Sequence, residues 1–368
     1  MDATQFRRAW RVAATLVAVG LLASVTASAA AANNTGGIRS ASTPNHYGFN
    51  KPLAIAYNDG HLWIANYGGN SVTEMTASGT WVRTVHGPRY GFRSPDAIVS
   101  HLGDVFVVNR AGSVTELNAT SGSLVRIIGG AKYDFGSPVA AIEQGGNIWV
   151  VDVSGAVTEF SAATGGLIRV LTNKTDARYG FNAPDAIAVA GADIWVTNKT
   201  GGSRTDPNAG AATEFVASTG SFVRRVAASA DGLETPSGIA FDGTHLWISD
   251  AATSSVSELS STGALVRIVA NSSFNDNYGF NAPTVVVASG PDVYVVSPPG
   301  ASPMVTQINA ATAEGNWYEC NTNTPDPQFN NPTGLVVHGG FVWVVSPGNN
   351  TLTQLSLAAG GNRVHLYV

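Results

Sequence analysis

The chain has 368 residues, of which 20 are Lys or Arg and 25 are Asp or Glu, so its formal net charge is −5. Only 12% of the residues are charged, which argues against a nucleic-acid-binding surface and against a disordered polyelectrolyte. The 41 glycines and the 44% of hydrophobic residues favour many short strands joined by tight turns. The composition therefore predicts an all-β protein that binds no nucleic acid.

The first 29 residues have the pattern of a secretory signal peptide. Three arginines precede an uncharged run over residues 12–25, and small residues then offer cleavage after Ala29 or after Ala32. The pair Arg7-Arg8 leaves the export route open between general and twin-arginine secretion. No second apolar stretch of about 18 residues follows, so we expect no transmembrane anchor after cleavage. The alanine-rich leader is typical of a bacterial protein, and we expect this one to be secreted and extracellular.

Seven short segments, each a proline followed by an apolar run, repeat along the chain. The spacings are 43, 43, 46, 52, 47 and 49 residues, and the prolines are Pro52, Pro95, Pro138, Pro184, Pro236, Pro283 and Pro332. Periods of this length are typical of propeller blades and solenoid units. We therefore divide the chain into the leader, an N-terminal segment of residues 30–46 and a repeat region of residues 47–368.

Each unit contains four short strands, called A, B, C and D in chain order. In the second unit they cover residues 95–99, 104–109, 113–117 and 123–127. Strand B has an aromatic residue at the same position in every unit, namely Trp63, Phe106, Trp149, Trp195, Trp247, Tyr294 and Trp343. Such a ring can bury a large apolar surface against the next sheet. Because ring closure protects the first and last sheets from edge pairing, the repeats predict a seven-bladed β-propeller of four-stranded antiparallel blades.

A glutamate in strand C and an arginine in strand D recur around a glycine hairpin. Folding each hairpin about its glycine pairs Glu74 with Arg83, Glu116 with Arg126, Glu159 with Arg169, Glu214 with Arg224 and Glu258 with Arg267. In the sixth unit we expect Gln307 to face Trp317. Cross-strand pairs of this kind contribute about 0.2 to 1 kcal/mol each, so we interpret the glutamates as structural and not catalytic.

The repeat has the consensus Pro-x-Ala/Gly-Ile, Leu/Ile-Trp-Ile/Val-x-Asn/Asp, Ser-Val-x-Glu-Leu and Gly-x-Leu-Val-Arg. It resembles the NHL-type propeller repeat, most closely in residues 236–240 and 245–250, and the resemblance covers residues 47–368. Families with similar repeats include virginiamycin B lyase, gluconolactonase-like calcium enzymes and extracellular binding propellers. The resemblance implies the fold and leaves the chemistry open.

A Tyr-x-Phe motif precedes strand A in five units, at residues 47–49, 90–92, 133–135, 179–181 and 278–280. One interpretation is an aromatic ring on one face that holds sugars or peptides. The other is that each motif anchors the crossover between two blades, and we favour it because the motif repeats without variation.

The resemblance to the lyase implies an inner-strand histidine and a metal-binding glutamate on the face formed by the D–A and B–C loops, and neither is identifiable. The lactonase resemblance implies acidic or amide ligands near the axis, which only Asp96 and Asp185 provide at the start of strand A. These two aspartates are candidate ligands for a divalent cation such as calcium. Two carboxylates supply only part of the six or so oxygens that calcium takes.

Strand B ends in Asn66, Asn109, Asp152, Asn198 or Asp250 in the first five units, and we assign these residues to turn formation. His61 and His245 occupy equivalent A–B turns and are not assigned to a site.

Irregular loops on a regular scaffold are usual places for specificity. The fourth unit has about nine extra residues in its B–C loop, within residues 199–212, and the sixth has Pro298-Pro299 and a long crossover over residues 321–327. The candidate ligand-binding residues are Asp96, Asp185, Lys199, Arg204 and Asp206.

The sequence therefore favours a monomeric, non-catalytic binding protein whose D–A and B–C loop face engages an extracellular protein, peptide or glycan. The alternative is a metal-assisted lyase or lactonase.

Overall fold

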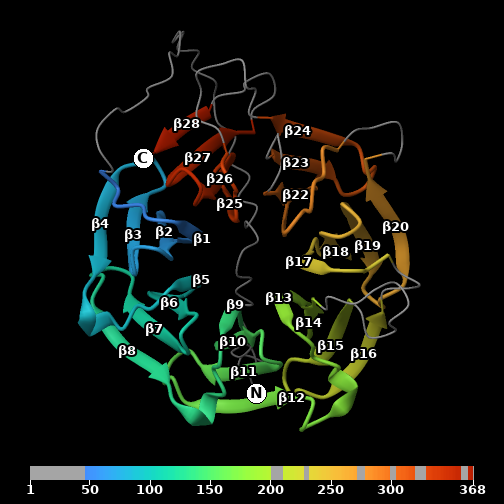
Figure 1. Cartoon of the computed structure of the whole chain (residues 1–368), viewed down its shortest axis with the longest axis horizontal. Helices are drawn as coiled ribbons and strands as arrows, with labels where there is room; N and C mark the ends of the chain where they lie inside the picture. The colour runs from blue at the N-terminus through green and yellow to red at the C-terminus, as the bar shows by residue number, and fades with distance from the viewer. Residues whose placement is uncertain are drawn as a thin grey trace, which may run out of the picture.

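The computed structural model describes residues 46–199, 210–227, 232–271, 278–298, 304–319, 329–357 and 364–367. Seven four-stranded antiparallel sheets are arranged as blades around a central axis (Figure 1). Strand A is innermost and strand D outermost in each blade, and the chain visits the blades in order. The predicted all-β, seven-bladed β-propeller is confirmed. Among the described residues, no helix is long and apolar enough to cross a membrane.

The first four blades contain sixteen strands and three short 3-10 helices. Blade 1 consists of β1 (Pro52–Asn58), β2 (His61–Asn66), β3 (Ser71–Thr76) and β4 (Trp81–His86). After η1 (Pro88–Tyr90), blade 2 consists of β5 (Pro95–His101), β6 (Asp104–Asn109), β7 (Ser113–Asn118) and β8 (Leu124–Gly129). After η2 (Ala131–Tyr133), blade 3 consists of β9 (Pro138–Gln144), β10 (Asn147–Asp152), β11 (Ala156–Ser161) and β12 (Leu167–Thr172). After η3 (Ala177–Tyr179), blade 4 consists of β13 (Pro184–Ala190), β14 (Asp193–Asn198), β15 (Ala211–Val216) and β16 (Phe222–Ala227).

The last three blades contain twelve strands. Blade 5 consists of β17 (Pro236–Phe241), β18 (His245–Asp250), β19 (Ser255–Ser260) and β20 (Leu265–Ala270). Blade 6 consists of β21 (Val285–Ser289), β22 (Asp292–Ser297), β23 (Met304–Asn309) and β24 (Gly315–Glu319). Blade 7 consists of β25 (Gly334–His338), β26 (Phe341–Ser346), β27 (Thr351–Ser356) and β28 (Val364–Tyr367).

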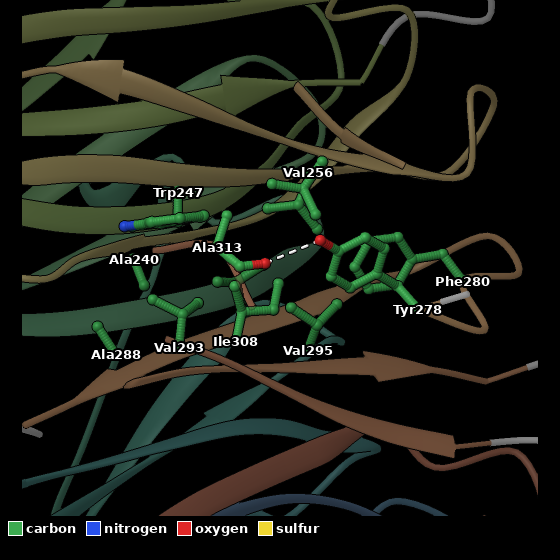
Figure 2. Packing of buried hydrophobic residues seen from close by; sticks show 12 residues of the cluster. Ala240, Trp247, Val256, Tyr278, Phe280, Ala288, Val293, Val295, Ile308 and Ala313 are labelled. Carbon is green, nitrogen blue, oxygen red and sulfur yellow. Dashed lines mark hydrogen bonds between the residues drawn. The ribbon is translucent and has the colours of Figure 1, made fainter. Parts of the chain in front are cut away.

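The hydrophobic core lies between neighbouring blades. In one such layer, Trp247 of blade 5 packs with Tyr278 and Phe280 of the following crossover and with Val293 and Ile308 of blade 6 (Figure 2). All seven predicted strand-B aromatics are at most 2% exposed. A strand buried on both faces needs an almost continuous apolar run, which explains the sequences of the B strands.

The Tyr-x-Phe motifs anchor the crossovers. The Tyr278 hydroxyl donates to the carbonyl of Ala313 at 2.8 Å, in the C–D hairpin of the blade that the motif precedes (Figure 2). The Tyr133 hydroxyl bonds the Gly165 carbonyl in the same way at 2.6 Å. A strand-C threonine, such as Thr158, donates to the carbonyl of the motif tyrosine. These contacts agree with the structural interpretation of the motif.

All four strands of blade 7 come from the C-terminal end of the chain, so no strand is exchanged between the termini. At the seam between blades 7 and 1, the Thr333 hydroxyl donates to the Leu53 carbonyl at 2.9 Å, and the Lys51 amide donates to Asn350 Oδ1 at 2.7 Å. The Tyr367 ring of blade 7 contacts the edge of Tyr47, which precedes blade 1, with 5.6 Å between the ring centroids. Side-chain contacts and short polar links therefore close the ring. Most of the predicted N-terminal segment, residues 30–45, lies outside the described residues.

The five predicted Glu-Arg pairs face one another across their C–D hairpins, and each pair makes an ion contact. In blade 3, Arg169 Nε lies 2.6 Å from Glu159 Oε2, and the carboxylate is only 3% exposed. The same arginine donates to the Ser218 carbonyl of blade 4 at 2.9 Å. The glutamates are therefore buried and their arginines join successive blades, so removing an arginine would leave an unpaired buried charge and cost more than breaking an exposed cross-strand pair.

The prediction for the sixth unit is wrong. Gln307 faces Asn316, and Trp317 faces Thr306. In blades 1 to 5 a register shift follows the glutamate, whereas the hairpin of blade 6 continues in regular register. Without that extra residue in strand D, the partner of the strand-C side chain moves by one position.

Candidate functional site

The candidate site lies on the face where strand A begins and strand B ends. The registers Pro95↔Asn109 and Pro184↔Asn198 bring the start of strand A and the end of strand B together in blades 2 and 4. The residue after strand B is fixed beside the start of strand A, because the Arg110 amide donates to the Ser94 carbonyl at 3.0 Å. This placement makes Asp96 and Asp185 neighbours of cationic side chains from their own blades.

Each aspartate forms an ion pair within its blade. Arg110 Nη1 lies 2.8 Å from Asp96 Oδ2, and Lys199 Nζ lies 3.1 Å from Asp185 Oδ2. The cations are the more exposed partners, since the side chains of Arg110 and Lys199 are 44% and 39% exposed, against 13% and 29% for Asp96 and Asp185. Each of the two pairs on this face is therefore neutral overall, and its cationic side chain is more exposed to solvent than its carboxylate.

The two pairs lie near enough to influence one another. Burial raises the pKa of Asp96, the Arg110 charge and hydrogen bond lower it, and the Asp185 carboxylate raises it again. Because blades 2 and 4 are not neighbours, this interaction depends on the convergence of the inner strands towards the axis (Figure 1).

Blade 3 separates the two pairs with apolar side chains. Val139 and Val153 occupy the positions of Asp96 and Arg110, as the register Asp152↔Pro138 shows, and both are partly buried. From blade 2 to blade 4, these positions on the face hold an ion pair, two valines and a second ion pair. This arrangement suits a ligand with an apolar group between polar or charged groups.

The residues of this site fit a resident divalent cation poorly. Each carboxylate already has a cationic partner, and calcium would require several more oxygen ligands. In the part of the chain that the structure describes, no three His, Cys, Asp or Glu side chains lie together as a metal site.

The polar residues that end strand B hold the crossovers. Asn109 Oδ1 accepts from the Arg93 amide at 3.2 Å, and its Nδ2 donates to Thr115 Oγ1 at 3.0 Å. Asp152 accepts from the Ser137 amide at 2.7 Å. These contacts agree with the turn role assigned to this position.

Of the candidate residues, the structure brings together Asp96, Asp185 and Lys199. Arg204 and Asp206, with most of the blade 4 insertion, lie outside the described residues, as do Pro299 and residues 321–327. Sequence reasoning missed Arg110. A signal for it was present, because Asp96 and Arg110 are 14 residues apart, as are Asp185 and Lys199.

The opposite end of the inner strands carries a different set of polar side chains. His101 Nδ1 of blade 2 lies 3.1 Å from Glu143 Oε1 of blade 3, and His338 of blade 7 stacks on Tyr57 of blade 1 at 3.6 Å between ring centroids. Each contact joins two successive blades. We assign these residues to packing between blades, and not to the candidate site.

The fold and its repeated blades place the chain among the seven-bladed β-propellers. No protein-family model and no curated protein sequence matches it. Its structure is similar to a chain of Kuenenia stuttgartiensis hydrazine synthase, with 13% identity, a TM-score of 0.67, and coverage of 89% of this chain and 100% of that one.

Two further similarities have the same character. The WD40 domain of Neurospora crassa Pan2 has 12% identity and a TM-score of 0.61, with 85% of this chain and 90% of that one covered. The computationally designed protein Ika8 has 13% identity and a TM-score of 0.58, with coverage of 86% and 88%. At such identities the likeness concerns the fold alone.

Proposed function

We propose that this protein is a secreted, non-catalytic binding propeller of the NHL-like type, which engages an extracellular protein or peptide through its D–A and B–C loop face. The observation that carries the proposal is the sequence of groups on that face, an ion pair, two valines and a second ion pair. Charges of both signs around an apolar contact suit a peptide segment with mixed side chains better than a uniformly charged ligand. The signal-like leader supports export.

Mutual neutralisation also favours binding over catalysis at this face. The cation beside each of Asp96 and Asp185 makes the carboxylate a weaker base and repels a metal ion. In a metal-assisted lyase or lactonase, the cationic side chain of a pair would have to move aside to relieve its repulsion with a metal ion bound to that carboxylate. The exposed Arg110 and Lys199 need no such rearrangement to meet a ligand carboxylate.

The test is a screen of the mature protein, starting at residue 30 or 33, against an array of extended peptides with mixed charge. Fluorescence anisotropy then compares wild type with Asp96→Asn/Asp185→Asn and Arg110→Gln/Lys199→Gln. We expect both variants to weaken binding of the selected peptide about tenfold or more, and added salt to weaken binding to wild type. Asp59→Asn, in an exposed A–B turn on the other face, is the matched control. Wild-type affinity in both double variants would overturn the proposal.

Two further measurements address the alternative and the export. If calcium raised the melting temperature of wild type but not of Asp96→Asn/Asp185→Asn, the metal-assisted enzyme would replace the binding protein as the better proposal. For export, the protein should be recovered from the culture medium with an N-terminus at residue 30 or 33, and retention of the leader in the cell fraction would contradict secretion.

A further inference from the structure

The first residue of strand B contacts the strand-C glutamate in several blades. His61 Nδ1 lies 2.7 Å from Glu74 Oε1, and in blade 5 the equivalent histidine lies 2.9 Å from its glutamate. In blade 3, Asn147 Nδ2 donates to Glu159 Oε1 at 2.7 Å. Each of these neighbours presents a nitrogen to the buried carboxylate, which is a favourable arrangement for an ionised acid.

Blade 6 shows what happens when the first residue of strand B is acidic. Asp292 takes that position, and the strand-C residue is Gln307 instead of a glutamate. Gln307 Nε2 donates to Asp292 Oδ2 at 2.7 Å. The amide removes the repulsion that two carboxylates would have at this contact.

Blades 2 and 4 have the acid at the first position but keep the glutamate. In blade 2, strand B begins with Asp104 and strand C contains Glu116. In blade 4 the corresponding residues are Asp193 and Glu214, and the two glutamates are 1% and 3% exposed. We infer that Asp104–Glu116 and Asp193–Glu214 each hold a proton to a higher pH than an isolated carboxyl group does, and that this proton removes the repulsion that the amide of Gln307 removes in blade 6. The two pairs thereby make the contacts from blade 2 to blade 3 and from blade 4 to blade 5 sensitive to the pH outside the cell.

The charged groups around Glu116 support this assignment. The pKa of Glu116 is raised to about 7, because burial and the Asp104 carboxylate raise it by more than Arg126 lowers it. Burial also raises the pKa of Glu214, with Arg224 lowering it and Asp193 raising it. Glu116 and Glu214 thus each interact with one arginine and with one carboxylate of the same blade.

The proton-binding pairs are connected to the next blade through the arginine. Arg126 Nη2 donates to Glu116 Oε1 at 3.2 Å and to the Ala163 carbonyl of blade 3 at 3.0 Å. From the other side, Arg83 of blade 1 donates to the Thr120 carbonyl in the C–D hairpin of blade 2. In blade 4, Arg224 bonds the Thr262 carbonyl of blade 5, and Arg169 of blade 3 bonds the Ser218 carbonyl.

The direction of the pH effect follows from the raised pKa of Glu116. The folded protein keeps a proton that the unfolded chain releases near the ordinary carboxyl pKa of about 4.5. Stability is therefore greatest below that value, falls as the pH rises towards about 7, and changes little above it for this group.

The experiment measures the melting temperature of the mature protein from pH 5 to pH 8. We expect wild type to lose stability over this range, and Asp104→Asn to lose less, because an amide beside Glu116 lets it ionise without repulsion. Asn147→Asp in blade 3 is the reciprocal variant and should steepen the loss. Parallel profiles in all three proteins would overturn the inference.

NMR titration detects the carboxyl proton of Glu116 directly and does not depend on the overall stability of the protein. In carbon-13 NMR of glutamate side-chain carboxyl groups, one resonance should titrate near pH 7, disappear in Glu116→Gln and move to lower pH in Asp104→Asn. Glu116→Gln reproduces the Asp292–Gln307 arrangement and serves also if Asp104→Asn fails to fold. If no glutamate resonance titrates above pH 6 in wild type, the pairs hold no proton and the inference is wrong.

Discussion

Removal of Arg169 measures how strongly the buried Glu-Arg pairs hold the ring together. Arg169→Ala deletes the ion contact to Glu159, which is 3% exposed, and the hydrogen bond to the Ser218 carbonyl of blade 4. The remaining polar contact of the carboxylate within the blade is Asn147. Leaving a buried charge without its partner costs about 3 to 5 kcal/mol of the free energy of unfolding, against at most about 1 kcal/mol for an exposed pair.

Urea unfolding followed by tryptophan fluorescence and circular dichroism gives the change in free energy. The loss should be smaller at pH 5 than at pH 8, because burial already raises the pKa of Glu159, and without Arg169 the carboxyl can take up a proton. Glu159→Gln combined with Arg169→Ala should recover part of the stability. Arg178→Ala, which removes the exposed ion pair with Asp176, is the control and should change stability far less. A loss below 1 kcal/mol for Arg169→Ala at pH 8 would refute the role given to these pairs.

Two other substitutions examine the packing between blades. Tyr179→Phe removes the hydroxyl that bonds the Gly220 carbonyl and should cost about 1 kcal/mol in urea unfolding, whereas an unchanged midpoint would show that the crossover does not depend on this bond. Gly238→Ala places a methyl group 2.7 Å from the Thr284 carbonyl oxygen, where blades 5 and 6 meet at their inner strands, and should lower the melting temperature by several degrees. Gly103→Ala, with no atom within 4 Å of the added carbon, is the control, and equal melting temperatures for the two variants would contradict the close approach.

The fold was predictable because its determinants are local and repeated. The strand-B aromatics recur at one register, and every one of them is buried between blades. The pairing of the strand-C glutamate with the strand-D arginine was predictable for the same reason in blades 1 to 5. It failed at Gln307, where the absence of a register shift moves the partner from Trp317 to Asn316. Whether a hairpin contains a bulge depends on backbone pairing that side-chain spacing alone does not specify.

The candidate site was less predictable than the fold. Asp96 and Asp185 were found because they depart from the consensus at one position of strand A. Their cationic partners share a spacing of 14 residues, but one is an arginine and the other a lysine, so residue identity alone did not mark Arg110. The proximity of blades 2 and 4 is a property of the closed ring, and sequence separation gives no measure of it.

Glycines of the C–D hairpins also leave room for a side chain of the preceding blade, so that each such contact runs from one blade to the next in chain order. A Cβ at Gly122 would lie 2.9 Å from Cδ of Arg83, and one at Gly165 would lie 3.0 Å from Cδ of Arg126, so each hairpin accommodates the arginine of the preceding blade. At the seam the incoming side chain is Tyr367, which packs in this way against Gly79 of blade 1.

The seam is therefore chemically different from the joints with an arginine. Burial raises the pKa of Tyr367 to about 12, and its hydroxyl donates to Gln354 at 3.3 Å, so the side chain stays neutral where an arginine would carry charge. This contact does not respond to salt or to pH near neutrality. Added salt would therefore act on the arginine-linked joints and leave the seam unchanged.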